Sequence, residues 1–329
     1  MSGVQHREVT ADEDGIRLDR WFARHFPQVG FGRLQKLIRN GEVRVDKAKA
    51  ETSTRLAAGQ TIRIPPVDDP GTVRPVKVNQ EDARFLKDII LYEDDDLYVF
   101  NKPHGLAVQG GSGTVRHLDG LLKSLPNKLG EAPRLVHRLD RDTSGCLVVA
   151  KTAAAATHFG KVFMSRSARK IYWALVAGNP TPRQGEISCF IAKRATEDGE
   201  QMVVVKNGTP GAVHSSSYYS TTDTASRRFA WVTLKPVTGR THQLRVHMAQ
   251  LGTPIIGDPR YFNIENWMPA PGLGEGLHLH ARRIALPLRN GKRLDISAPL
   301  PPHMRESWDA LGFDAERFDV QNTDPEDDA

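Results

Sequence analysis

The chain has 329 residues, enough for two or three domains, and its apolar (39%) and charged (26%) fractions are those of an ordinary globular protein. The polar opening segment carries no apolar signal-peptide core, and no stretch approaches the roughly 18 apolar residues of a membrane-spanning helix, so we expect a cytoplasmic protein. Its two cysteines are too few for a disulfide framework or a structural zinc site, and Cys146 is expected to pack as a small apolar residue.

The positive charge is concentrated near the N-terminus. The formal net charge is +6, yet residues 15–66 alone carry eleven Lys and Arg against four Asp and Glu. Such a basic unit favours a polyanionic partner such as nucleic acid, because neutralising phosphates supplies most of the sequence-independent affinity. A basic surface exposed to solvent without a partner is the alternative that charge alone leaves open.

Two amphipathic helices are expected at the start of this basic unit. Residues 15–26 place their apolar side chains at helical spacing, and residues 33–40 repeat the pattern before Gly41, which ends the second helix. The outer face of the second helix carries three cations at intervals of three residues: Arg33, Lys36 and Arg39. The unit therefore presents a cationic face.

Short strands follow these helices. Residues 42–45 and 61–66 alternate apolar and polar side chains, with Arg44 pointing outward. The stretches RLQKLIRNGEVRVD and LAAGQTIRIPP resemble an S4 domain, a small RNA-binding module, and this implies an RNA-binding unit over residues 15–66. The candidate RNA-binding residues are Arg33, Lys36, Arg39 and Arg44. The turn VGFG replaces the Ser or Thr that usually begins the second S4 helix, and glycine there weakens the helix start by only about a few tenths of a kcal/mol.

The rest of the chain divides into three segments. Residues 67–84 have no consistent period and contain Pro and Gly, so we interpret them as a linker. A larger unit is expected over residues 85–311. Residues 312–329 end in acidic residues and are expected to form a disordered tail.

Strand patterns outnumber helix patterns in the larger unit. Apolar runs typical of strands lie within residues 89–108, 146–150, 171–178, 229–237 and 277–288, and helices are expected at 153–163 and 241–252. No βαβ regularity, GxGxxG or GxxxxGK[ST] pattern accompanies them, and the loop QGGSG at 109–113 is interpreted as flexible and not as a phosphate cradle. We predict an α+β fold built on a mixed, mainly antiparallel sheet.

Four charges crowd the stretch LVHRLDRDTSG, directly before a predicted buried strand. An extended backbone over residues 135–140 would turn Val136, Arg138 and Asp140 to one side. The guanidiniums of Arg138 and Arg141 would favour the ionised form of the Asp140 carboxyl. An ionised carboxylate suits a nucleophile or a general base and does not suit a general acid. A structural ion-pair cluster at a turn is the alternative.

A second candidate site lies in PVTGRTHQLRVHMAQLG, residues 236–252. Thr241 is expected to cap a helix, which would place Arg240 at the positive end of the helix dipole, where an anion is favoured. Arg240 is therefore a candidate counterion for Asp140. An exposed surface arginine is the alternative.

A third candidate is the pair of rings in SARKIYWALVAG. Tyr172 and Trp173 are neighbours in a predicted strand, so they lie on opposite faces. One ring should belong to the core, and the other could stack on a base.

The histidines do not form a metal-binding pattern. His242 and His247 are five residues apart, His278 and His280 share a strand face, and no HExxH or CxxC motif accompanies them. No GxSxG motif indicates a serine hydrolase. We expect no metal site.

Taken together, these stretches resemble the RluA-type family of pseudouridine synthases. The resemblance covers NKPHGLAV, LVHRLDRDTSGCLVVAKT, RKIYWALVAG, PVTGRTHQLRVHMAQLGTPIIGD and LHLHARRIAL, in the family's order. With the S4-like unit in front it extends over roughly residues 15–311. Details such as GEVRVD, RIPPV, ILYEDD and QGGSG are most similar to the branch that modifies large-subunit ribosomal RNA.

The resemblance implies an isomerase that converts uridine to pseudouridine in RNA, without a cofactor and as a monomer. It assigns the catalytic aspartate to Asp140, the active-site tyrosine to Tyr172 and the arginine paired with the aspartate to Arg240. Arg138 and Arg141 would bias the charge of Asp140 or meet phosphate.

The residues leave the chemical step open. After the base has been flipped out of its stack, Asp140 could attack ribose C1′, attack uracil C6 or remove a proton from C2′. An RNA-binding or ribosome-assembly factor without catalysis and a metal-dependent nuclease are the two alternative classes of function.

Overall fold

The computed structural model describes residues 3–26, 29–67, 79–110, 116–127, 131–196, 199–265 and 267–320. Contacts divide the chain into two units, Met1–Val76 and Lys77–Ala329. Among the described residues, no helix combines the length and the apolar character needed to cross a membrane.

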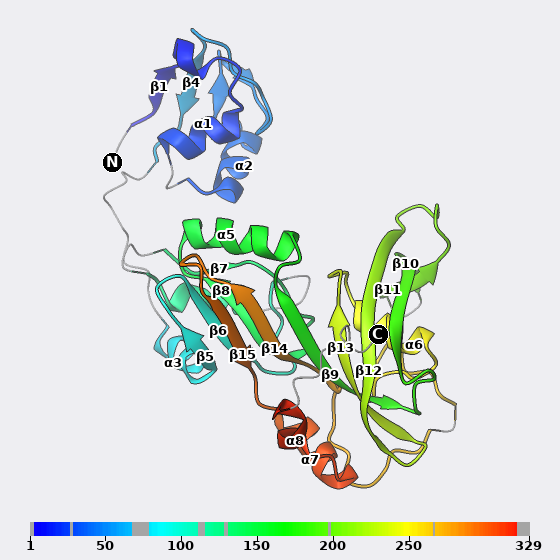
Figure 1. The fold of residues 1–329 in the computed structure, drawn as a ribbon. Helices are drawn as coiled ribbons and strands as arrows, with labels where there is room; N and C mark the ends of the chain where they lie inside the picture. Colours follow the sequence, from blue (N-terminus) through cyan, green and yellow to red (C-terminus); the bar gives the residue numbers. More distant parts are fainter. Residues whose placement is uncertain are drawn as a thin grey trace. The chain divides into compact units, whose positions relative to one another are not determined.

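The N-terminal unit combines two helices with a small sheet (Figure 1). Its strands lie in the order β1-β4-β2-β3. The elements in chain order are β1 (Gln5–Glu8), the 3-10 helix η1 (Ala11–Glu13), α1 (Leu18–His25), α2 (Phe31–Arg39), β2 (Arg44–Val45), β3 (Ala48–Lys49) and β4 (Thr61–Ile64). Both predicted helices and both predicted strand segments are thus confirmed.

One apolar core holds this unit together. Leu18, Trp21 and Phe22 of α1 are buried, and they share the core with Leu34 of α2 and Ile62 of β4. These residues carry the helical and alternating spacings of the sequence, so the hydrophobic pattern determines the packing. Gly30 is the N-cap of α2, as the turn VGFG predicts, and it supplies no side-chain cap.

The larger unit is built on one extended sheet. Its elements in chain order are α3 (Gln80–Asp88), β5 (Ile90–Glu93), β6 (Leu97–Lys102), α4 (Leu118–Leu121), the 3-10 helix η2 (Leu122–Ser124), β7 (Arg134–Leu135), β8 (Ser144–Ala150), α5 (Ala153–Met164), β9 (Arg169–Ala177), β10 (Gln184–Thr196), β11 (Gly199–Val205), β12 (Val213–Ala225), β13 (Phe229–Pro236), α6 (Gln243–Gln250), β14 (Leu279–Pro287), β15 (Arg293–Ser297), α7 (Pro302–Leu311) and α8 (Ala315–Val320).

The sheet is mixed and mainly antiparallel, which confirms the predicted fold class. Among the described residues its strands follow the order β11-β10-β12-β13-β9-β14-β8-β6-β5, with β15 beside β14 and β7 beside β8. The pairing of β14 with β8 is parallel, and the other strand pairs that these residues form in this sheet are antiparallel. The parallel pair lies near the middle of the sheet and is formed by Ser144 and Gly145, the last two residues of HRLDRDTSG.

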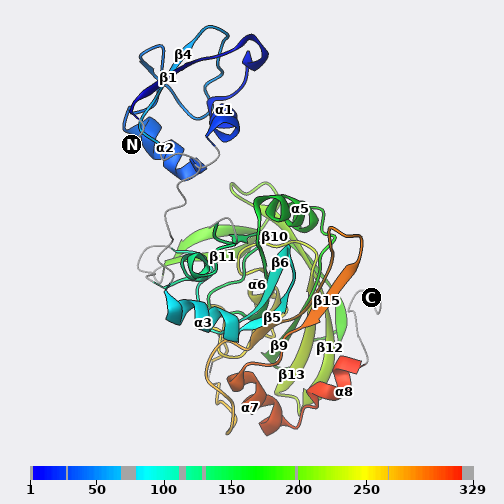
Figure 2. The ribbon, with the colours of Figure 1, turned by 90° about the vertical axis from the view of Figure 1, so that its left-hand side faces the viewer.

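Helices cover both faces of the sheet. On one face α5 packs against alternate residues of β6 and β8, and α7 packs against β9 and β13. On the other face α3 and α4 cover the intervening residues of β6 and β8, and α6 covers those of β9 and β13. Figures 1 and 2 show α5 at one end of the unit and α7 and α8 together at the other end. Tyr172 packs on both core clusters of the second face.

The predicted strands and helices of this unit are found, and further elements accompany them. The runs at 146–150, 171–178, 229–237 and 277–288 form β8, β9, β13 and β14, and the two predicted helices form α5 and α6. The strands β10, β11 and β12 and the helices α3, α4, α7 and α8 have no counterpart in the prediction. Cys146 is buried among apolar residues, as predicted, and burial raises the pKa of its thiol to about 12.

The predicted domain boundaries differ from the structure at the linker. The N-terminal unit starts before residue 15, because β1 pairs with β4 along its whole length. Val67 belongs to the core of that unit, and α3 begins at Gln80, inside the predicted linker of residues 67–84. Residues 68–78 of that linker lie outside the described part of the chain, as do residues 111–113 of the loop QGGSG.

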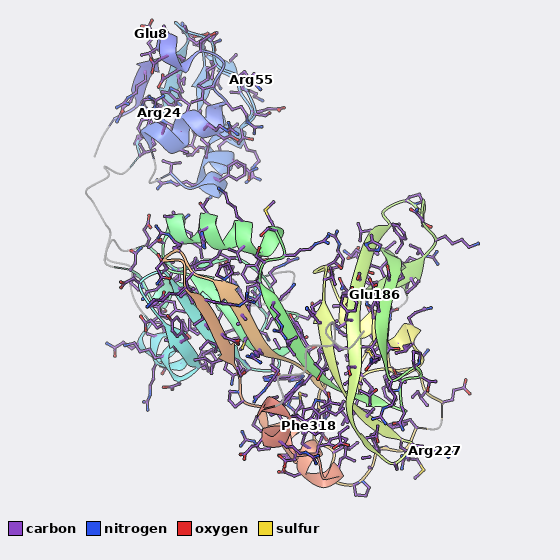
Figure 3. The ribbon with its side chains drawn as sticks, in the orientation of Figure 1. Glu8, Arg24, Arg55, Glu186, Arg227 and Phe318 are labelled. Atoms are coloured by element: carbon purple, nitrogen blue, oxygen red, sulfur yellow. The ribbon has the colours of Figure 1, made fainter. Side chains whose placement is uncertain are left out.

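The predicted tail of residues 312–329 is ordered in its first part. Phe313 and Phe318 pack on Trp231 with ring centroids 5.9 and 5.1 Å apart, and Figure 3 shows Phe318 on α8 beside α7. These apolar rings stabilise a final helix that the acidic composition of the tail did not predict. Residues 321–329 lie outside the described part of the chain.

Gly145 allows β8 and β14 to approach each other. Its φ is +106°, and a Cβ at this position would lie 2.3 Å from the carbonyl oxygen of Ala281 on β14. A side chain would therefore meet backbone that cannot move without breaking the sheet.

We predict that Gly145→Ala destabilises the protein by about 3 kcal/mol, since it adds a backbone clash to an unfavourable φ. The matched control is Gly208→Ala, where φ is +87° and nothing lies within 4 Å of the added Cβ. The control should cost only about 1 kcal/mol. Urea unfolding measures both values, and equal losses would contradict the close approach of the two strands.

Candidate active site

A cavity of about 880 Å³ opens where the HRLD stretch meets α6. It is lined by residues 107–110, by residues 135–141 and Thr143, by the end of α5 with Arg166, by the start of β9, and by residues 236–245. Asp140, Tyr172 and Arg240, which lie far apart in the sequence, all line it. The structure thus brings the three predicted catalytic residues to one cavity.

A partly buried histidine, His137, shapes the segment before Asp140. The strand β7 ends at Leu135, and the backbone N–H of Val148 donates to His137 Nε2 at 2.8 Å where a longer β7 would have continued the ladder. Residues 135–140 are therefore not one extended strand, contrary to the prediction. The ring of His137 stacks on Phe163 at 4.2 Å. Burial, with the charge of Lys170, lowers the pKa of His137 to about 3, so the ring is neutral and can accept this bond.

Lys102 anchors the segment after Asp140. Its side chain is buried, and Nζ donates to the carbonyl oxygens of Pro103, Leu106 and Arg141 at 2.8–2.9 Å. Burial lowers the pKa of Lys102 to about 7, and the charges of Asp142 and Asp140 oppose that shift. Three carbonyl acceptors match the three N–H bonds of an ammonium group.

Lys102 was not singled out from the sequence. The signal that could have found it is its place at the end of an apolar run, because a lysine buried there must have several acceptors.

The cation beside Asp140 is Arg245 and not the predicted Arg240. Arg245 Nη1 lies 3.9 Å from Asp140 Oδ2. The Nε and Nη2 atoms of the same guanidinium each donate to the carboxylate of Asp258 at 2.7 Å. The Cζ atom of this guanidinium lies 5.0 Å from the centroid of the Tyr261 ring. The Asp258 side chain is fully buried and that of Arg245 is 4% exposed. This two-point contact fixes the guanidinium in one orientation.

The position of Arg240 follows from where α6 begins. The helix starts at Gln243, its N-cap is His242 with φ of +53°, and no side chain caps it, so Thr241 is not the cap. Gln243 Oε1 accepts from Thr238 Oγ1 at 2.6 Å and from the backbone N–H of Arg240 at 3.0 Å. Arg240 therefore lies in a tight turn, and its Nε donates to the carbonyl oxygen of His214 at 3.2 Å.

Tyr172 and Trp173 lie on opposite faces of β9, as predicted. Trp173 is buried and packs edge-on against Trp231 at 4.5 Å, whereas Tyr172 is partly buried and lines the cavity. Burial raises the pKa of the Tyr172 phenol, and the charge of Asp140 adds to this shift. The phenol is therefore neutral at neutral pH.

The arginines around Asp140 face the solvent side of the cavity. Arg138 is exposed and its Nη1 donates to Gln109 Oε1 at 3.2 Å. Arg141 has a 71% exposed side chain, and its Nε lies 3.4 Å from Asp142 Oδ1. Both guanidiniums are accessible to an incoming anion.

The candidate histidines serve as hydrogen-bonding residues within the fold. His247 contacts Ser215, His278 contacts Ser307, His280 contacts Ser144, and His242 contacts Tyr261, each at 2.7–2.9 Å. Among the described residues there is no group of three or more His, Cys, Asp or Glu that could hold a metal ion.

The N-terminal cations have different surroundings. Arg33, Lys36 and Arg39 are exposed on α2. Arg44 is also exposed, but its guanidinium donates to the carbonyl oxygens of Gly41 and Lys47 at 3.1 and 3.2 Å, so it also stabilises the turns around β2.

Comparisons with known proteins identify the family of the chain. Residues 96–250, which include the HRLD stretch and α6, match the family described as RNA pseudouridylate synthase. The chain is 36% identical to the ribosomal large subunit pseudouridine synthase C of Escherichia coli (strain K12), over 92% of this chain and 95% of that protein. It is 34% identical to RNA pseudouridine synthase 4, mitochondrial, of Arabidopsis thaliana, over 91% of this chain and 80% of that protein.

A solved structure shows the same fold. Human RNA pseudouridylate synthase domain containing 4 superimposes with a TM-score of 0.60 and 31% sequence identity, over 71% of this chain and 97% of that one. The chain therefore belongs to the RluA-type family of pseudouridine synthases, which are isomerases that act on RNA.

Proposed function

We propose that the protein converts specific uridines of large-subunit ribosomal RNA to pseudouridine, with Asp140 as the catalytic carboxylate. One observation supports this assignment above the others. Among the described residues that line the cavity, Asp140 is the one carboxylate, and six Arg and Lys side chains line the cavity with it. Such a site attracts a polyanion and directs a single carboxyl group at it.

The proposed reaction needs only groups that this chain supplies. Pseudouridine is an isomer of uridine, so the N-glycosidic bond is broken and uracil C5 is joined to the ribose without a cofactor. The uridine must leave its stack before it can enter the cavity. Asp140 then attacks C1′ or C6 or takes a proton from C2′, and each of these steps requires the ionised carboxylate.

Three side chains around Asp140 take supporting roles in this proposal. Arg245, held by Asp258, orients the carboxylate. Tyr172 packs its neutral ring on the uracil and assists proton transfer at C5. Arg138 and Arg240, at the accessible side of the cavity, meet RNA phosphates.

The proposal extends to the RNA-binding unit, the substrate and the place of action. The exposed cations of α2 bind RNA as an S4 domain does, and the substrate is ribosomal RNA, alone or in a large-subunit assembly intermediate. The protein acts as a monomer in the cytoplasm.

Asp140→Asn removes the charge and keeps the shape of the side chain, so the isomerisation rate should fall by roughly 10⁴-fold or more. The test uses cells that lack the protein and that receive either the wild-type or the variant gene, followed by mapping of pseudouridine at single-nucleotide resolution. Asp119→Asn, an exposed acid on α4, is the control and should restore the wild-type pattern. A variant at Asp140 that restored every pseudouridine would show that another residue is the catalyst.

Arg245 and Arg240 should differ in their effects on turnover. Arg245→Gln alone leaves Asp258 buried without its partner and should cost about 3–5 kcal/mol of stability, so the double variant Arg245→Gln/Asp258→Asn is the informative one. We expect it to fold and to turn over about 100-fold more slowly, because Asp140 is no longer positioned. Arg240→Gln should lose about tenfold or less, mainly through RNA affinity. Single-turnover kinetics measures the rate loss of each variant. A larger loss in Arg240→Gln than in the double variant would indicate that Arg240, and not Arg245, is the partner of Asp140.

The cations of α2 should contribute to the salt dependence of RNA binding. In the full-length protein, Arg33→Gln/Lys36→Gln/Arg39→Gln should reduce the slope of log affinity against log salt by about 0.7–0.9 for each phosphate that the variant no longer neutralises. Arg24→Gln/Lys47→Gln/Lys49→Gln removes the same charge from the same unit and should change the slope less. Equal slopes for wild type and the first variant would contradict RNA binding by α2.

A further inference from the structure

A second cavity of about 300 Å³ lies beside the first one. Four segments line it: the turn between α5 and β9, the start of β9, the end of β13, and the first residue of β15. Five of its lining residues are cations and none is acidic: Arg166, Arg169, Lys170, Lys235 and Arg293.

The sheet brings these cations together from distant parts of the sequence. Leu234 of β13 pairs with Tyr172 of β9, so Lys235 continues alongside the start of β9. On the other side Arg169 pairs with Ala285 of β14. Arg293 enters β15 opposite Pro287, two residues further along β14. One end of the four strands β13, β9, β14 and β15 therefore gathers like charges.

No acidic residue lines the second cavity beside Arg166, Lys170 and Arg293. The carboxylate of Asp295, two residues from Arg293, already accepts two bonds from Arg283, at 2.6 and 2.7 Å. Burial lowers the pKa of Lys170, and the charge of Arg166 lowers it further. Like charges in a hollow repel one another and focus a positive potential that an anion would relieve.

The two cavities share a border. Arg166, Lys170, Pro236 and Val237 line both of them. A strand whose uridine enters the first cavity beside Asp140 can therefore continue into the second one.

The kind of ligand follows from the lining. Arginine and lysine offer only donors, and a guanidinium suits phosphate oxygens. The remaining lining residues are Ser167, Ala168, Pro236 and Val237, so there is no aromatic ring on which a base could stack. The lining suits the backbone of a nucleic acid and does not read its sequence.

We propose that the second cavity binds one or two phosphodiester groups of the RNA strand on one side of the target uridine. This inference rests on the proposed function and adds to it a site for the flanking backbone. The site holds the strand in register while the uridine occupies the first cavity.

The test compares two double variants of the full-length protein. Arg166→Gln/Arg293→Gln removes two exposed cations of the second cavity, and Lys161→Gln/Lys292→Gln removes two exposed cations close to them in the sequence that do not line it. The ligand is a synthetic RNA that spans a uridine mapped as the wild-type target. The first variant should bind it about tenfold more weakly, with a salt slope reduced by about 0.7 for each phosphate that it no longer binds. The second should bind as the wild type does.

A chemical change in the RNA gives a second readout. Replacing the flanking phosphates one at a time by neutral methylphosphonates should weaken binding to the wild-type protein at one or two adjacent positions. The same replacements should have little further effect on Arg166→Gln/Arg293→Gln, because that protein no longer has the cations that bind these phosphates. The positions found with the wild-type protein do not depend on how well the variant folds, and the comparison with the variant assigns those positions to the second cavity.

The outcomes separate this inference from the proposed function. If the wild-type protein forms pseudouridine but both double variants bind equally well, or each methylphosphonate weakens the wild type and the first variant equally, the phosphate site is wrong and the function stands. If the wild-type protein forms no pseudouridine in any large-subunit ribosomal RNA, the proposed function itself is wrong.

Discussion

The buried contact between Arg245 and Asp258 is the constraint on which the candidate active site depends. A guanidinium that donates two bonds to one carboxylate cannot rotate, and its remaining edge then faces Asp140. Asp258 is held in turn by the backbone N–H groups of Arg260 and Tyr261, at 2.9 and 3.1 Å. Arg245 lies on α6, and Asp258 follows Ile255 and Ile256, which belong to the sheet core. The position of the cation beside Asp140 is therefore set by the fold and not by the substrate.

Asp140 itself is held from both sides of its loop. His137 before it accepts a backbone N–H of β8, and Lys102 after it binds three carbonyl oxygens, one of them that of Arg141. The close approach of β8 and β14 at Gly145 places this loop over the middle of the sheet. The cavity then combines one acid with many cations, an arrangement that would be costly without a polyanionic partner.

Those strands of the fold that consist of apolar runs could be predicted from the sequence. The strands β8, β9, β13 and β14 are such runs, but β12 is not, because Ser215 and Ser217 are buried there and bond His247 and Gln243 of α6. The hydrophobic pattern of the sequence does not predict these hydrogen-bond partners. For the site, the predicted Asp140 and Tyr172 line one cavity, and their roles stay a prediction. The expected start of α6 and the family resemblance both point to Arg240 as the partner of Asp140, and neither points to Arg245. The helix start differs from the expected one through local bonds such as those of Gln243, and Arg245 lies beside Asp140.

The proposed mechanism requires that Asp140, held by Arg245, acts directly on a flipped uridine. A crystal structure of the protein with an RNA that contains its mapped target would be the decisive test. We predict that the uridine occupies the 880 Å³ cavity, with an oxygen of Asp140 about 3–3.5 Å from C1′, C6 or C2′, and with Arg245 still bound to Asp258. A target uridine that stays stacked in the RNA, or one bound with Asp140 facing only solvent, would contradict this mechanism.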